Sequence, residues 1–335
     1  MTSPNASLPD SPASPGISVI LPVLNEQAHL EDSIRAILSQ NYLGKFEVIL
    51  ALGPSRDSTN EIARTLSAED SRVILVENPS GQTAAGLNIA LNASTQDVVV
   101  RVDAHAEIPN NYLQLVVEIL RESGAVNVGG VMGAEGVTFF ESAVAAAMCS
   151  PFGVGGSRFH IGGKAGYVDT VYLGAFIRQA VIDAGGFDER FVRAQDWELN
   201  YRLRQNGGKV YFDPRLHVTY RPRSDFRKLA KQYFEYGRWR RVIARKYPET
   251  INYRYLAPPL ALIGTLLSLV AGSIFDPSLY LPAATYITFI AITPLFISKN
   301  LAHYPLLVFI LPTMHFSWGL GFLTSPRKLV PDSLR

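Results

Sequence analysis

Short apolar runs alternate with amphipathic segments over the first hundred or so residues of the chain. Four runs rich in branched apolar residues have the length of buried strands: 17–23, 46–52, 72–78 and 97–103. The segments between them carry apolar residues at helical spacing and predict three helices: 26–40, 58–66 and 83–92. Strands that alternate with helices are typical of a parallel sheet covered on both faces, so the pattern predicts an α/β fold.

A different pattern occupies the last part of the chain. Between Tyr255 and Pro326 the only formally charged residues are Asp276 and Lys299. Three uncharged windows lie in this region: 256–275, 279–298 and 305–324. Each has the roughly 20 residues that a helix needs to cross a bilayer, so we predict two to three transmembrane helices.

These patterns divide the chain into five parts. A Ser- and Pro-rich start without an apolar run predicts a disordered tail, not a signal peptide. The predicted parts are the tail at 1–15, the α/β domain at 16–220, basic amphipathic juxtamembrane helices at 221–250, transmembrane helices at 251–326 and a second tail at 327–335.

Composition supports a folded protein without disulfides. Of 335 residues, 47% are apolar and 18% are charged, which excludes global disorder. The single cysteine, Cys149, cannot form an internal disulfide, and no Cys/His spacing typical of zinc modules occurs.

Charge is concentrated between Arg221 and Lys246. This stretch holds ten basic residues and two acidic ones, a net charge of +8, although the whole chain carries only +2. Such a block is typical of proteins that bind nucleic acid or an anionic membrane. Because apolar windows follow it directly, we interpret it as a helix in the lipid headgroup plane and expect no nucleic-acid partner.

Ligands of parallel α/β sheets bind beyond the carboxyl ends of the strands, here after Val23, Leu52 and Val102. No glycine lies between Gly16 and Gly44, and no Walker motif is present. The sequence therefore argues against a dinucleotide-dependent dehydrogenase and against a P-loop nucleotidase.

Acidic residues and a histidine stand at positions that suit catalysis. Asp103 and His105 follow a predicted strand at i and i+2, and their oxygen and nitrogen atoms suit Mn²⁺ or Mg²⁺ bound to phosphates. A helix cap and a loop histidine are the structural alternative. Asp196 precedes or begins a predicted helix beside Trp197, where it could act as a general base or simply cap the helix.

Six motifs occur in the order found in one enzyme family: ISVILPVLNE (17–26), RVDAHA (101–106), DTVYLGA (169–175), GGFDE (185–189), QDWELNYRLR (195–204) and YGRWR (236–240). Together they resemble the family-2 glycosyltransferases, which have a GT-A fold and use nucleotide sugars. Within that family the chain looks similar to the membrane-bound branch typified by succinoglycan chain-extending glucosyltransferases.

The resemblance implies a GT-A nucleotide-sugar-binding domain over 16–220, with a mixed, mainly parallel sheet. It implies that seven residues bind the donor: Pro22, Asn25, Glu26, Asp57, Asn88, Arg101 and Asp103. It also implies that three residues ligate the metal: Asp103, His105 and His217, the last being alternatively a strand-end histidine. Asp196 would be the catalytic base, and four residues would contact the acceptor: Trp197, Glu198, Arg238 and Trp239.

Some positions depart from the family pattern. The loop after the second strand, LGPSRD (52–57), keeps only the last of its usual acidic residues. His105 replaces the second acid of the common D-x-D motif, and Gln195 replaces the acid expected before Asp196. The YGRW sequence at 236–239 differs from the Q-x-x-R-W of processive synthases, which favours the addition of one or a few sugars.

The expected activity is inverting, metal-dependent transfer from a nucleotide sugar, a UDP-hexose, to a lipid-linked saccharide in cell-surface polysaccharide or glycolipid synthesis. The expected location is the cytoplasmic membrane, with several crossings and the catalytic domain facing the cytoplasm. Two alternatives remain open at this point. The acceptor could be polyprenyl phosphate itself, giving a lipid-linked monosaccharide, or the protein could be an inactive membrane scaffold.

Overall fold

The computed structural model describes Leu8 and residues 14–329. Most of the predicted tail at 1–15, and the predicted tail at 327–335 from Val330 onward, lie outside the described residues. The chain forms two compact units. The first comprises residues 1–133 and 162–220, and the second comprises residues 134–161 and 221–335.

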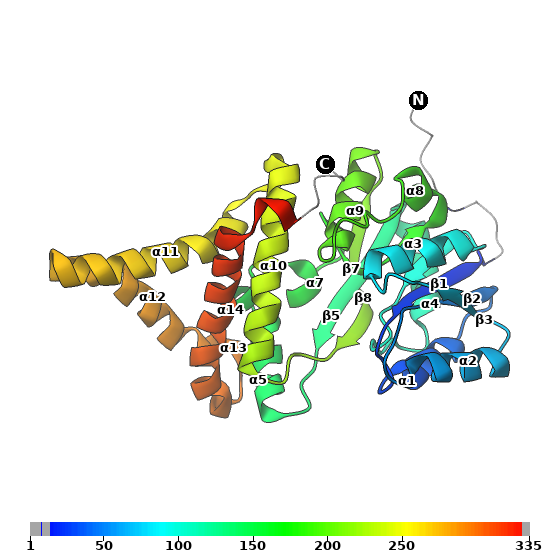
Figure 1. Cartoon of the computed structure of the whole chain (residues 1–335), viewed down its shortest axis with the longest axis horizontal. Helices are drawn as coiled ribbons and strands as arrows, with labels where there is room; N and C mark the ends of the chain where they lie inside the picture. Colours follow the sequence, from blue (N-terminus) through cyan, green and yellow to red (C-terminus); the bar gives the residue numbers. More distant parts are fainter. Residues whose placement is uncertain (1–7, 9–13, 330–335) are drawn as a thin grey trace. The chain divides into compact units, whose positions relative to one another are not determined.

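The first unit is built on a sheet of eight strands (Figure 1). The strands are β1 (Ile17–Val23), β2 (Phe46–Leu52), β3 (Val73–Glu77), β4 (Val98–Arg101), β5 (Asn127–Ala134), β6 (Gly166–Tyr167), β7 (Tyr172–Ile177) and β8 (Val210–Tyr220). Their order is β3-β2-β1-β4-β7-β5-β8-β6. The first four run parallel, whereas β7 is antiparallel to both β4 and β5, so the predicted mixed sheet is confirmed.

Six helices accompany this sheet: α1 (Leu30–Leu38), α2 (Thr59–Glu69), α3 (Thr83–Ala93), α4 (Tyr112–Ser123), α8 (Arg178–Asp183) and α9 (Gln195–Gln205). The helix predicted over 26–40 begins only at Leu30. Asn25 has a left-handed backbone with φ of 56°, and the N–H groups of residues 25–27 bond to side chains after β2. These bonds hold residues 25–27 in a loop against the segment after β2, and the regular helix begins after that loop.

Burial of branched side chains holds the sheet together. Ile17, Val19, Ile20 and Leu21 of β1 are all 0% exposed, as expected for a central strand covered on both faces. Each such side chain contributes about 1.5–3 kcal/mol when it is fully removed from water. In the β1–β2 register Val23 pairs with Leu52, so the loops that follow the two strands begin side by side.

The second unit is helical. Its α-helices are α5 (Phe139–Met148), α6 (Pro151–Val154), α7 (Arg158–Ile161), α10 (Phe226–Lys246), α11 (Tyr253–Ile274), α12 (Leu281–Ile292), α13 (Pro294–Ile297) and α14 (Tyr304–Thr324). Three short 3₁₀ turns lie between these helices, η1 (Pro248–Thr250), η2 (Pro277–Tyr280) and η3 (Leu301–His303), and η4 (Arg327–Leu329) follows α14. Helices α10 and α14 lie side by side (Figure 1).

Glycines allow α10 and α14 to approach closely. A Cβ atom on Gly237 of α10 would lie 2.0 Å from the Trp318 carbonyl oxygen of α14. A Cβ atom on Gly321 of α14 would likewise lie 2.0 Å from the Phe234 carbonyl oxygen of α10. Only glycine fits at either position, as in tightly packed helix pairs of membrane proteins.

Three segments of the described chain are long and apolar enough to cross a membrane: Tyr253–Ile274, Pro277–Ile297 and Leu301–Thr324. They overlap the three windows that the sequence pattern indicates, with starts two to four residues earlier. Many of their large apolar side chains are exposed, for example Leu260 at 63% and Phe296 at 74%. An apolar surface of this kind on long helices is typical of contact with lipid.

Candidate active site

The loops after β1 and β2 are joined by hydrogen bonds. The Asn25 backbone N–H donates to Ser55 Oγ at 3.0 Å, and the Arg56 N–H donates to Asn25 Oδ1 at 2.8 Å. Asparagine tolerates the left-handed backbone of position 25 better than most residues, which explains its presence there. Asn25, a predicted donor-binding residue, therefore fixes the relative position of two loops at one edge of the sheet.

Asp57 takes part in a second set of hydrogen bonds between the loops after β1 and β2. Its carboxylate accepts hydrogen bonds from the Thr59 hydroxyl and, at 3.4 Å, from the Gln27 N–H. The Thr59 hydroxyl also accepts the Glu26 N–H at 2.8 Å. The hydrogen bond from the Thr59 side chain lowers the pKa of Asp57. Sequence reasoning missed Thr59, although its position at the start of a helix, just after Asp57, is a usable signal.

A further contact links the loops after β1 and β4. His105 Nδ1 lies 3.0 Å from Glu26 Oε1. The His105 side chain is 41% exposed and that of Glu26 is 22% exposed, so both are within reach of a ligand. Pro22 occupies β1 opposite Ala51 of β2, four residues before Glu26. The predicted donor-binding residues Pro22, Asn25, Glu26 and Asp57 thus follow or end adjacent strands at one edge.

Arg101 connects two carboxylates that are far apart in the sequence. Its Nη2 donates to Asp103 Oδ1 at 2.9 Å, and its Nη1 donates to Asp196 Oδ1. The Arg101 side chain is only 6% exposed, whereas those of Asp103 and Asp196 are 22% and 25% exposed. The structure therefore brings the predicted base at the start of α9 beside the predicted metal ligand at the end of β4.

Burial raises the pKa of Asp196, and the nearby Arg101 guanidinium opposes that effect. Burial disfavours the charged carboxylate, while the guanidinium favours it. Asp196 is consequently held next to a cation in a partly buried position. A raised carboxylate pKa is a common property of groups that exchange protons in active sites.

The residues at the end of β4 fit a divalent metal. Asp103 uses Oδ1 to bind Arg101, and within the described residues its Oδ2 has no hydrogen-bond partner. Carboxylate and imidazole atoms suit Mn²⁺ or Mg²⁺, ions that take their remaining ligands from water and substrate phosphates. Nowhere in the described chain do three or more His, Cys, Asp or Glu side chains gather closely enough to hold a metal by themselves.

His217, the third predicted metal ligand, belongs to no such group of three or more side chains within the described residues. It is an exposed residue of β8, and a Cβ atom on Gly133 would lie 2.2 Å from its imidazole. The ring thus lies against the glycine backbone of the neighbouring strand β5. This arrangement fits the alternative of a strand-end histidine, and the role of His217 as a metal ligand stays a prediction.

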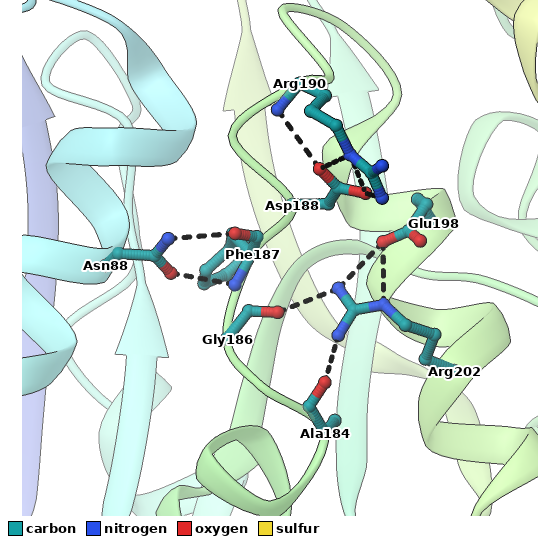
Figure 2. Close-up of polar contacts among 8 residues, drawn as sticks. All are labelled: Asn88, Ala184, Gly186, Phe187, Asp188, Arg190, Glu198 and Arg202. Carbon is teal, nitrogen blue, oxygen red and sulfur yellow. Dashed lines mark hydrogen bonds and ion pairs between the residues drawn. The ribbon is translucent and has the colours of Figure 1, made fainter. Parts of the chain in front are cut away.

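The two predicted acceptor residues on α9 have different surroundings. Trp197 is partly exposed and stacks on Tyr201, with ring centroids 5.7 Å apart. Glu198 is 0% exposed and pairs with Arg202 at 2.7 Å (Figure 2). Direct contact between Glu198 and an acceptor is therefore not supported, because its carboxylate is enclosed by protein and bound to an arginine one turn away.

The ion pair with Glu198 holds the Arg202 guanidinium against the turn before α9. Besides Glu198, it donates to the carbonyl oxygens of Ala184 and Gly186 (Figure 2). Gly185 and Gly186 both have left-handed backbones, with φ of 82° and 73°, so the turn before α9 exposes its carbonyls to this guanidinium. Sequence reasoning missed Arg202, although Glu and Arg at i and i+4 on a helix are a recognisable signal.

Asn88 holds the same turn from the other side. Its Nδ2 donates to the Phe187 carbonyl oxygen at 2.8 Å, and its Oδ1 accepts the Phe187 N–H at 2.8 Å (Figure 2). Nδ2 also lies 2.9 Å from Glu189 Oε1. In this structure the predicted donor-binding residue Asn88 therefore positions the loop that leads to Asp196.

The remaining predicted acceptor residues lie on α10 in the second unit. Trp239 is 5% exposed, so its ring is used mainly in packing. The Arg238 side chain is 25% exposed and pairs with Glu235 at 3.0 Å. Of the two, Arg238 is the more accessible to an acceptor.

Known proteins with the same fold define the class. A solved structure of the mannosyltransferase PcManGT from Pyrobaculum calidifontis, in complex with GDP-Man and Mn²⁺, matches with a TM-score of 0.61 at 20% identity, covering 96% of this chain and 90% of that one. S. aureus TarS 1–349 in complex with UDP-GlcNAc matches with a TM-score of 0.52 at 14% identity, covering 92% and 91%. The fold is thus that of the GT-A glycosyltransferases.

Sequence comparison identifies the family. Residues 18–177 match the model of glycosyl transferase family 2. The chain is 31% identical over 312 residues to the succinoglycan biosynthesis protein ExoA of Rhizobium meliloti (strain 1021), which covers 91% of this chain and 93% of that protein. It is 23% identical over 263 residues to the dolichyl N-acetyl-alpha-D-glucosaminyl phosphate 3-beta-D-2,3-diacetamido-2,3-dideoxy-beta-D-glucuronosyltransferase of Methanococcus voltae, covering 76% and 81%. The chain belongs to glycosyltransferase family 2.

Proposed function

We propose that this enzyme transfers a sugar, with inversion, from a UDP-hexose to a lipid-linked saccharide during polysaccharide or glycolipid synthesis. The observation that carries the proposal is the pairing of Arg101 with both Asp103 and Asp196. One carboxylate lies at the strand end where GT-A donors are expected, and the other begins the helix that carries Trp197. A transferase must hold donor and base near one another, because the reacting atoms of donor and acceptor have to approach to about 3–3.5 Å.

The relatives support the biosynthetic role by their names. One is a succinoglycan biosynthesis protein and another is a transferase acting on a dolichyl-phosphate-linked sugar. Solved structures of the same fold contain GDP-Man, UDP or UDP-GlcNAc, which supports a nucleotide-sugar donor here.

On the donor side, Pro22, Asn25, Glu26 and Asp57 form the nucleotide pocket. The hydrogen bonds between the β1 and β2 loops position this pocket before the donor arrives. Pre-formed loops avoid part of the entropy cost of binding. Asn88 acts in the same binding step by fixing the turn at Phe187.

On the acceptor side, Asp196 removes the proton from the attacking hydroxyl, and a single in-line displacement then inverts the anomeric carbon. Arg101 holds the Asp196 carboxylate in place for this step. Trp197 offers an aromatic face to the acceptor sugar. Asp103 and His105 would hold a divalent ion, which when bound neutralises charge on the departing diphosphate.

The membrane region keeps the enzyme near its acceptor. Three apolar helical segments suit a multi-pass protein of the cytoplasmic membrane, and the basic helix α10 suits the anionic headgroups of its cytoplasmic face. We place the catalytic unit on the cytoplasmic side, where nucleotide sugars are made.

The test is a screen of UDP-, GDP- and dTDP-sugars with membranes that contain the full chain. We expect release of UDP and labelling of the lipid extract in the presence of Mn²⁺, and loss of both with excess chelator. Membranes that carry Asp196→Asn are the matched control and should retain donor binding. Full transfer in excess chelator, or label that never enters the lipid extract, would reject the metal or the lipid-linked acceptor respectively.

A further inference from the structure

Several polar atoms in the second unit are buried without a hydrogen-bond partner within the described residues, and two of them belong to residues far apart in the sequence. His160 Nδ1 on α7 and Arg254 Nε at the start of α11 each lack a partner within the described residues. An unsatisfied buried polar group of this kind costs about 1–3 kcal/mol. Both residues lie outside the active site described above, and neither is used by the proposed reaction.

Arg254 packs against a glycine turn that has open space at its other position without a side chain. A Cβ atom on Gly155 would lie 3.4 Å from Arg254 Nε, so the guanidinium packs directly against the backbone at that position. Gly155 has a left-handed backbone with φ of 69°, and a Cβ atom on Gly156 would meet nothing within 4 Å. The turn therefore offers open, glycine-lined space next to a cation.

Two guanidinium groups lie near the Tyr255 ring in this region. In the part of the chain that the structure describes, no acidic side chain pairs with Arg254. The Arg240 guanidinium lies 3.6 Å from the centroid of the Tyr255 ring, and the Arg254 guanidinium lies 5.8 Å from the same centroid. Burial lowers the pKa of His160 to about 4, and the charge of Arg254 contributes to that shift.

An anion would satisfy all of these features together. It would accept hydrogen bonds from a guanidinium and an imidazole, and it would balance the charge of Arg254. Arg254 is the second residue of α11, a helix long and apolar enough to cross a membrane, so the site lies where a lipid headgroup would be. Planar guanidinium groups are especially suited to phosphate oxygens.

We propose that Gly155, His160 and Arg254 form a site for the phosphate or diphosphate group of the lipid-linked acceptor. The geometry alone supports anion binding at this site, whereas the assignment of the anion to the lipid-linked acceptor rests on the proposed function. Bulk phospholipid offers the same phosphate chemistry, so the test must separate the two sources.

The experiment titrates the purified full chain in neutral detergent with farnesyl diphosphate, a soluble isoprenoid diphosphate, and records the heat of binding. Farnesol tests the contribution of the isoprenoid alone, and inorganic pyrophosphate tests the anion alone. Phosphatidylglycerol in the micelles tests competition by a bulk phospholipid. We expect farnesyl diphosphate to bind more tightly than the other three probes.

Substitutions then locate the site. Arg254→Gln should weaken farnesyl diphosphate binding at least tenfold, Arg254→Lys should weaken it less, and His160→Phe should weaken it severalfold while keeping an aromatic ring. Arg64→Gln is the matched control, because Arg64 is an exposed arginine on α2. Thermal unfolding of each variant establishes that it is folded, and Arg254→Lys remains informative if Arg254→Gln does not fold.

The outcomes separate this inference from the proposed function. Wild-type affinity in both Arg254→Lys and His160→Phe overturns the site, and equal binding of phosphatidylglycerol overturns its assignment to the acceptor. UDP release from a UDP-sugar with Mn²⁺ is measured on the same samples without acceptor. If the wild type releases no UDP but binds farnesyl diphosphate through Arg254, the anion site stands and the proposed transferase reaction fails.

Discussion

The Arg101 guanidinium donates a hydrogen bond to the Asp196 carboxylate, although 95 positions separate the two residues in the sequence. Because Arg101 also binds Asp103, it is the link between the strand end at β4 and the first turn of α9. Arg101→Met would leave two partly buried carboxylates without their shared cation. We expect unfolding to become easier by about 3 kcal/mol, with at least a tenfold loss of turnover.

Arg101→Lys separates charge from geometry. A lysine keeps the positive charge but cannot form two directed bonds to different carboxylates from one planar group. It should recover much of the stability, measured by thermal unfolding, and little of the turnover. Arg72→Met is the matched control, because Arg72 pairs with Asp70 on the surface and its loss should cost less than about 1 kcal/mol. Equal effects at positions 101 and 72 would contradict the linking role.

Strands β1 and β2, which precede the predicted donor-binding loops, could be predicted closely from the sequence. The ranges 17–23 and 46–52 are those of β1 and β2, because buried parallel strands are continuous apolar runs. The contact between Arg101 and Asp196 could not be predicted. It depends on the insertion of β7 next to β4, a crossover that local patterning does not encode.

Asp196→Asn tests the base directly. The amide keeps the size of the side chain but cannot accept a proton from the acceptor hydroxyl. Turnover should fall by roughly a hundredfold or more, while the affinity for the nucleotide, measured by calorimetry, should change little. Unchanged turnover would reject Asp196 as the base and would favour an acceptor that is already an anion, such as polyprenyl phosphate.

The Glu198–Arg202 pair positions the turn before α9. Arg202→Gln would remove the Arg202 ion pair from the fully buried Glu198 carboxylate and release the Ala184 and Gly186 carbonyls (Figure 2). We expect a loss of about 3–5 kcal/mol in the free energy of unfolding. Glu198→Gln combined with Arg202→Gln should cost less than the sum of the two single changes, because the double variant no longer holds one charge of this pair without the other. Strict additivity in denaturant titrations would rule out this coupling.

Glu198 also shows where sequence reasoning failed. Its neighbours are mostly polar or charged, so the segment QDWELNYRLR gives no apolar pattern that would mark position 198 as buried. The structure buries it because a charged partner on the next turn satisfies the carboxylate. The hydrogen bonds between Asn88 and Phe187 could likewise not be predicted, because they exist only in the folded chain, and the donor-binding role of Asn88 stays a prediction.

Asp57 should make the stability of the folded protein depend on pH in the acidic range. The pKa of Asp57 is lowered in the folded protein by the Thr59 hydrogen bond, so its contribution to stability is complete above the unfolded pKa of about 3.9. That contribution is lost as the pH falls through the lower, folded pKa. Asp57→Asn should therefore lower the melting temperature relative to wild type at pH 7 and at pH 5, with the difference shrinking below about pH 4. A difference that stays constant down to pH 3 would assign the effect to packing instead.

The exposed basic residues of α10 should bring the enzyme to its acceptor without anchoring it. Arg227 and Lys231 are exposed, whereas Arg240 is 7% exposed and bonds to Thr250, so the first two are the ones that can meet anionic lipid. Each basic residue near such a surface contributes about 1 kcal/mol. Arg227→Glu with Lys231→Glu in the full chain should lower transfer to a lipid-linked acceptor severalfold and leave release of UDP from the donor unchanged.

The protein should stay in the membrane after a high-salt wash, because the apolar helices hold it there. Loss of the variant from salt-washed membranes, or transfer equal to wild type in vesicles rich in anionic lipid, would contradict this division of roles between α10 and the apolar helices.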